Sequence, residues 1–176
     1  MKNGNALHLY YGDGKGKTTA AMGLALRAAG QGRRVLIAQW LKNNRSGELN
    51  ALKALANVEI VLGEPIARLT RRMTEEERRR EALRQAAHYD RVAERIEDIH
   101  PQLIVLDELA VAIHKGFVEE DEAVTDCVRW LGSAEVVVTG RWAPESLLAK
   151  ADYITEMVKH RHPYDLGVPA RPGIEV

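Results

Sequence analysis

The sequence predicts an α/β fold in which a mostly parallel sheet carries helices on both faces. Short apolar runs rich in Val, Ile and Leu alternate with helical patterns along the whole chain. Such continuously apolar runs are typical of strands buried on both faces, and intervening helices allow successive strands to pair in parallel. No internal repeat, low-complexity segment or linker interrupts the series, so residues 1–176 are expected to form a single nucleotide-binding domain.

The individual elements follow from apolar runs and from the residues that begin or end helices. Strands are expected at residues 6–11, 35–40, 58–62, 103–106, 135–139 and 153–158. Helices are expected at residues 17–29, 46–56, 74–99, 121–131 and 144–150. The longest helix opens with a capping-box pattern, Thr74 followed by Glu77. It is expected to end at His100, because the residue before a proline avoids the helical region. Gly30-Gln31-Gly32 is expected to end the first helix, since glycine suits a left-handed C-cap.

Composition excludes several classes of protein. Apolar residues make up 45% of the 176 residues and charged residues 28%, which is typical of a globular domain. Lys plus Arg equals Asp plus Glu at 25 each, so no global charge favours nucleic acid or an anionic membrane as a partner. The single cysteine, Cys127, lies on an apolar helical stripe and is expected to be a buried core residue. Without a signal peptide or a long apolar run, the sequence predicts a cytoplasmic protein.

A glycine-rich segment between the first strand and the first helix carries the strongest functional signal. Glycines let the backbone approach phosphate oxygens closely, and amides at the following helix start favour an anion. The candidate nucleotide-binding residues are Gly12, Asp13, Gly14, Lys15, Gly16, Lys17, Thr18 and Thr19. The loop is one residue shorter than the usual pattern, because its first glycine would stand at the position of Tyr11. The alternative interpretation is a tight glycine turn that binds no ligand.

Two carboxylates at the end of a later apolar strand support phosphate binding. Asp107 and Glu108 follow the run Leu103–Leu106, an arrangement that places acidic groups beside the metal of a P-loop. Mg²⁺ prefers hard oxygen ligands and binds few protein groups, so Thr18 and Glu108 are the candidate ligands for Mg²⁺ or Mn²⁺. Together the loop and this strand end narrow the expected fold to a P-loop NTPase-like (RecA-like) domain.

The loop and several further segments resemble the P-loop type of ATP:corrinoid adenosyltransferases, which act on cob(I)alamin or cob(I)yrinic acid a,c-diamide. That family shares the shortened loop. The resemblance continues over nearly the full length in the segments Gln39-Trp40-Leu41-Lys42, Val105-Leu106-Asp107-Glu108-Leu109, Val138-Thr139-Gly140-Arg141, Val158-Lys159-His160, Tyr164-Asp165-Leu166-Gly167-Val168 and Gly173-Ile174-Glu175.

The resemblance implies transfer of carbon rather than phosphate, in cobalamin biosynthesis or salvage. The Co(I) of a reduced corrinoid would attack the 5′ carbon of ATP, and triphosphate would leave. Lys17, Lys15 and Arg141 are the candidate catalytic residues, because positive charge there would stabilise the leaving group. Gln39 and Lys42 are weaker candidates at a strand end. The resemblance also implies a homodimer and an electron donor such as a flavoprotein.

The chain departs from the family between the third strand and the long helix. Well-studied relatives carry aromatic residues there, near the lower face of the corrinoid, whereas residues 61–73 carry Arg68, Arg71 and Arg72 and no aromatic residue. Two hypotheses follow: the cobalt is reduced in another way, or the preferred corrinoid is an intermediate that lacks the lower base. The first strand begins near residue 6, so the N-terminal segment that covers the active site in many relatives is expected to be missing or replaced.

Two other functions remain open from the residues alone. A P-loop kinase or NTPase, and a nucleotide-dependent switch, would carry the same loop and the same acidic strand end. The C-terminal segments argue against both, because a generic nucleotide-binding protein has no need of them.

Overall fold

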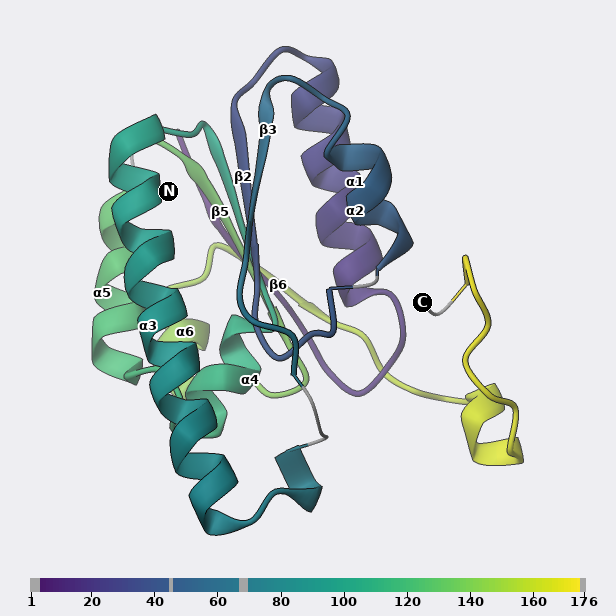
Figure 1. The fold of residues 1–176 in the computed structure, drawn as a ribbon. Coiled ribbons are helices and arrows are strands. Elements are labelled where there is room, and N and C mark those ends of the chain that lie inside the picture. Colours follow the sequence, from purple (N-terminus) through teal and green to yellow (C-terminus); the bar gives the residue numbers. More distant parts are fainter. Residues whose placement is uncertain (1–3, 45, 67–69, 175–176) are drawn as a thin grey trace.

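The computed structural model describes residues 4–44, 46–66 and 70–174, so Arg68 and Glu175 lie outside the described residues. Its centre is a six-stranded sheet with the order β3-β2-β4-β5-β1-β6 (Figure 1). The strands are β1 (Leu7–Tyr11), β2 (Val35–Gln39), β3 (Val58–Leu62), β4 (Leu103–Asp107), β5 (Glu135–Gly140) and β6 (Tyr153–Glu156). All five pairings between these strands are parallel, which confirms the expected fold class.

Helices cover both faces of the sheet, as the apolar runs predict (Figure 1). One face carries α1 (Lys17–Gly30) and α2 (Gly47–Leu52). The other carries α3 (Glu75–Ile99), α4 (Leu109–His114), α5 (Glu120–Trp130) and α6 (Glu145–Leu148). Successive strand residues serve opposite faces: Ile37 packs in the cluster with α1, whereas Leu36 and Ala38 pack in the cluster with α3.

The long helix α3 begins and ends where the sequence predicts. The Glu77 N–H donates to Thr74 Oγ1 at 3.2 Å, and the Glu77 carboxylate accepts from the Thr74 N–H at 2.8 Å. This capping box satisfies two amides that would otherwise lack partners. At the other end His100, which precedes Pro101, has a left-handed φ of 48°. The expected boundaries of α3 are therefore confirmed.

Some short elements differ from the expectations. α4 and two 3₁₀ turns, Thr70–Arg72 and Pro163–Leu166, were not expected, while α2 and β6 are shorter than the predicted segments. Five of the six residues of α4 are apolar and buried, so its sequence shows no helical periodicity. Burial on every side comes from tertiary packing, which the local pattern does not reveal.

Cys127 lies fully buried in the core cluster on the α5 side, as expected for a small hydrophobe. Burial raises the pKa of its thiol to about 12, which excludes a reactive thiolate at neutral pH. Among the described residues, no helix has the length and apolarity to cross a membrane.

Candidate nucleotide-binding site

The loop between β1 and α1 turns tightly at the carboxyl edge of the sheet. Gly12 and Gly16 have φ values of 109° and 118°, a region that glycine adopts without steric cost. A Cβ on Gly14 would lie 2.6 Å from the carbonyl oxygen of Met157. The Gly14 N–H donates to that same oxygen at 2.6 Å. The path of the loop therefore depends on glycine at all three positions.

The start of α1 is suited to an anion. Its N-cap is Gly16, no side chain caps it, and its first turn contains no acidic residue. The first amides of a helix lack intrahelical partners, and the helix dipole favours negative charge beside them. Lys17 donates from Nζ to the Gly14 carbonyl oxygen at 2.6 Å, and burial lowers the pKa of its ammonium. Amides and a partly desolvated lysine thus face the same loop, which is the chemistry that binds phosphate.

Asp107 is fully buried at the end of β4 and is the centre of a hydrogen-bond network. Its Oδ1 accepts from Thr18 Oγ1 at 2.9 Å and from Thr139 Oγ1 at 2.7 Å. Its Oδ2 accepts from Gln39 Nε2 at 3.0 Å. Three neighbouring strands and α1 therefore meet at one carboxylate, whose orientation is fixed by three donors.

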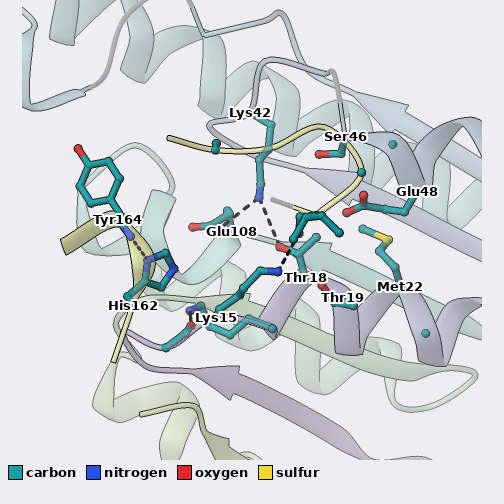
Figure 2. A pocket seen from close by; sticks show the side chains of 18 of the residues that line it. Lys15, Thr18, Thr19, Met22, Lys42, Ser46, Glu48, Glu108, His162 and Tyr164 are labelled. Atoms are coloured by element: carbon teal, nitrogen blue, oxygen red, sulfur yellow. Dashed lines mark hydrogen bonds and ion pairs between the residues drawn. The ribbon is translucent and has the colours of Figure 1, made fainter. Parts of the chain in front are cut away.

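Glu108 is positioned by its backbone. Its φ is 65°, an unusual value for a residue other than glycine, and its N–H donates to Thr139 Oγ1 at 2.9 Å. Burial raises the pKa of its carboxyl. The side chain lines a cavity beside Lys42, whose Nζ lies 3.9 Å from Glu108 Oε1 (Figure 2). The same Nζ lies 3.5 Å from Asp107 Oδ2. Burial opposes the charge of Lys42, but the two carboxylates outweigh it and raise the pKa of Lys42.

The cavity has a volume of about 870 Å³, which is enough for a nucleotide. The loop residues from Asp13 to Thr19 line its polar end together with Lys42 and Glu108. Its other walls are partly apolar, with Met22 and Leu26 from α1 and Leu52 from α2. A polar end with an adjoining apolar wall suits a molecule that carries phosphates at one end and a flat ring system at the other.

The C-terminal segment 157–174 closes one side of the cavity (Figure 2). Asp13 Oδ1 accepts from the Lys159 N–H at 2.9 Å, which lowers the pKa of the Asp13 carboxyl. Lys15 Nζ donates to the Ile174 carbonyl oxygen at 2.7 Å. His162 also lines the cavity, and its Nδ1 accepts from the Tyr164 N–H at 3.1 Å. The glycine-rich loop is thus attached to the far end of the chain.

Most of the residues that the sequence singled out lie together here. The cavity is lined by Asp13, Gly14, Lys15, Gly16, Lys17, Thr18, Thr19, Lys42 and Glu108. Gly12 and Arg141 do not line it. The Arg141 carbonyl oxygen accepts from the Gly12 N–H at 3.3 Å, and its exposed guanidinium lies 5.6 Å from the centre of the Trp142 ring. Its charge still contributes to lowering the pKa of Lys17, after burial and the opposing effect of Glu108.

Several residues at the centre of the hydrogen-bond network were minor candidates, or no candidates, in the sequence analysis. Asp107, rather than Glu108, accepts from the Thr18 hydroxyl. Thr139 had no assigned role, and Gln39 was a weaker candidate, yet both donate to Asp107. The available signal was position: all three residues stand at or next to the carboxyl ends of apolar strands that pair in parallel, where ligand crevices form.

This fold defines the class of the protein: an α/β domain with an all-parallel sheet, consistent with a P-loop NTPase-like domain, whose glycine-rich loop lies at the carboxyl edge of the sheet. The chain belongs to the ATP:corrinoid adenosyltransferase family BtuR/CobO/CobP, whose pattern it matches over residues 3–176. It is 32% identical to the corrinoid adenosyltransferase of Pseudomonas aeruginosa over 172 residues, which cover 96% of this chain and 82% of that protein.

Two other relatives are also named corrinoid adenosyltransferases. The corrinoid adenosyltransferase CobA of Salmonella typhimurium is 32% identical over 170 residues, which cover 95% of this chain and 83% of the relative. The corrinoid adenosyltransferase of Escherichia coli K12 is 29% identical over 170 residues, with the same two coverages of 95% and 83%.

Proposed function

We propose that this chain transfers the 5′-deoxyadenosyl group of ATP to the Co(I) centre of a corrinoid, in cobalamin biosynthesis or salvage. The observation that carries the proposal is the cavity, in which a phosphate-binding loop adjoins an apolar wall. Membership of the family supports this reaction over a kinase, an NTPase or a switch. Attack by the cobalt electron pair forms a Co–C bond and breaks the C5′–O bond, whose electrons leave with the triphosphate.

The chain's own residues would act by orientation and charge. The amides at the start of α1 and the ammonium groups of Lys15 and Lys17 would hold the triphosphate and stabilise the negative charge that develops as it leaves. Arg141 does not line the cavity, so it would act on the phosphates through long-range charge or after a side-chain rotation. No covalent nucleophile is required for this reaction.

The donor set fits Mg²⁺ or Mn²⁺. The Thr18 hydroxyl and the Glu108 carboxylate are hard oxygen donors on the wall of the same cavity, and Asp107 holds Thr18 in place. Within the described residues, no group of three or more His, Cys, Asp or Glu side chains is placed to hold a metal. Mg²⁺ commonly binds to one or two protein groups plus substrate phosphates, which agrees with this set. When bound, the ion would add positive charge beside the phosphates.

Partners follow from the proposed reaction. ATP and a reduced corrinoid are the two substrates, and a reductant such as a flavoprotein would supply the electron that yields Co(I). We further propose that residues 1–176 form one nucleotide-binding domain, that the enzyme acts as a homodimer in the cytoplasm, and that neither nucleic acid nor membrane is a partner.

The test is anaerobic incubation of the protein with ATP, Mg²⁺ and a chemically reduced Co(I) corrinoid. We expect a light-sensitive Co–C bond in the visible spectrum and one triphosphate released per corrinoid. Orthophosphate or ADP without any change in the corrinoid would instead identify an NTPase or a kinase. Parallel reactions with complete cobalamin and with a corrinoid lacking the lower base would show which one is preferred.

A further inference from the structure

Lys42 lies beside the two proposed metal ligands, Thr18 and Glu108, and beside Asp107, which orients Thr18. Its Nζ is 3.4 Å from Thr18 Oγ1 and 3.9 Å from Glu108 Oε1 (Figure 2). It is also 3.5 Å from Asp107 Oδ2. Each of these distances exceeds the 2.7–2.9 Å that is typical of a tight charge-assisted hydrogen bond. The ammonium therefore sits between three acceptors without being locked to any one of them.

The residues on either side of Lys42 include two with left-handed backbone conformations. Leu41 and Asn44 both have left-handed φ values, 55° and 60°, although neither is a glycine. Such conformations cost free energy and persist where the surrounding structure imposes them. The Lys42 carbonyl oxygen accepts from the Ile66 N–H at 3.0 Å, which attaches this turn to the chain beyond β3. The fold thus holds the base of the Lys42 side chain firmly, while its flexible stem leaves the ammonium able to move.

We propose that Lys42 is the built-in counter-ion of the metal site and that a divalent cation must displace it. This inference rests on the proposed function, because it concerns the metal of that same site. Asp107 is fully buried and the adjacent Glu108 is partly buried, so these two carboxylates need positive charge nearby when no metal is bound. The Lys42 ammonium supplies that charge. It lies beside the Thr18 and Glu108 oxygens that the metal would use, and two cations cannot bind to both oxygens at once.

The cavity offers a second position for the displaced ammonium. Lys42 and Glu48 line the same cavity, and Glu48 is among the carboxylates that favour the charged form of Lys42 (Figure 2). The phosphates of a bound nucleotide would offer a stronger partner. The metal alone must therefore compete with Lys42, whereas the metal with a nucleotide gives the lysine a new anion. Lys42 thereby couples metal binding to nucleotide binding.

The first test measures binding of Mn²⁺ alone, by the electron paramagnetic resonance signal of the free ion, in wild type, K42M and K42Q. Methionine keeps the approximate length of the stem without charge, and glutamine keeps a hydrogen-bond donor. K150M, at an exposed lysine outside the cavity, is the matched control. We expect both Lys42 variants to bind Mn²⁺ about tenfold more tightly than wild type, and K150M to match wild type.

Coupling is measured by repeating the titration with ATP and no corrinoid. ATP should tighten Mn²⁺ binding less in K42M and K42Q than in wild type. Unchanged or weaker binding of Mn²⁺ alone in the folded Lys42 variants would overturn the inference. If neither variant folds, wild-type protein decides: acetylation of Lys42, followed by mass spectrometry, should become several-fold faster when Mg²⁺ is added without nucleotide. An unchanged rate at Lys42 would equally overturn the inference.

These results separate the two proposals. Wild-type protein that forms the Co–C bond while K42M gains no Mn²⁺ affinity would refute the role of Lys42 and leave the adenosyl transfer standing. Wild-type protein that forms no Co–C bond while K42M gains Mn²⁺ affinity would refute the transfer reaction and leave the counter-ion role standing.

Discussion

The Gly14 N–H donates to the Met157 carbonyl oxygen at 2.6 Å, which joins the glycine-rich loop to the chain that follows β6. The contact is so close that a side chain on Gly14 has no space, since its Cβ would approach the same oxygen to 2.6 Å. The shape of the glycine-rich loop is therefore fixed partly by a segment from the other end of the sequence.

This contact predicts the effect of G14A. The added methyl group must push the loop or residue 157 away, so we expect a loss of about 1–3 kcal/mol in the free energy of unfolding and at least a tenfold loss of activity. Urea unfolding and the adenosylation assay measure the two effects. G30A is the control, because nothing lies within 4 Å of a Cβ at Gly30 in α1. Equal behaviour of the two variants would contradict the prediction.

Lys17 should be needed for activity but not for folding. Its ammonium donates to the Gly14 carbonyl oxygen of the adjacent loop, and this partly buried group faces the proposed phosphate site. We expect K17A to lose about a hundredfold or more in kcat/KM, while its melting temperature stays close to that of wild type. K150A serves as the surface control. Activity close to wild type in K17A would show that the loop does not bind the reacting phosphates.

Asp107 and Gln39 should behave as a coupled pair. In D107N the new amide would face the Gln39 amide that now donates to Asp107 Oδ2, leaving a buried donor unpaired at a cost of about 1–3 kcal/mol. Adding Q39E supplies an acceptor and restores the buried charge. We expect the double variant to recover part of the lost stability in urea unfolding. Strictly additive losses would show that the two side chains are not coupled.

The buried imidazole of His88 should make the free energy of unfolding smaller in mild acid. Burial lowers its pKa to about 4, and its Nε2 lies 3.1 Å from the Gln39 carbonyl oxygen, to which it donates when neutral. The unfolded chain binds this proton near pH 6.5, so the stability is fully present above that pH and is lost as the pH falls towards 4. The contribution is on the order of 3 kcal/mol. H88Q keeps a donor and should lose less stability between pH 7.5 and 5 than wild type; parallel curves would contradict this.

Substitutions of Arg141 test whether a positive charge outside the cavity lining contributes to the reaction. If its charge acts on the triphosphate, R141A should lower kcat/KM by about tenfold, whereas R141K should retain more activity because it keeps the charge. Steady-state kinetics with varied ATP would show whether kcat or KM changes. Equal losses in both variants would indicate that the contact with the Trp142 ring matters more than the charge.

Sequence alone determined the class of this protein, because its signals are local. Apolar runs marked all six strands, a capping box marked the start of α3, and three glycines with Lys17 and Thr18 marked the proposed phosphate loop. Backbone conformation and short-range hydrogen bonding impose these patterns on neighbouring residues, so they can be read without a structure.

Tertiary structure decided which residues meet at the site. Thr18, the segment from Gln39 to Lys42, and Thr139 are far apart in the sequence, and the strand order β2-β4-β5-β1 brings them around Asp107. The helix α4 and the closing C-terminal segment likewise depend on partners from other parts of the chain. Parallel pairing gathers strand ends that are distant in sequence, and no local pattern encodes which ends become neighbours.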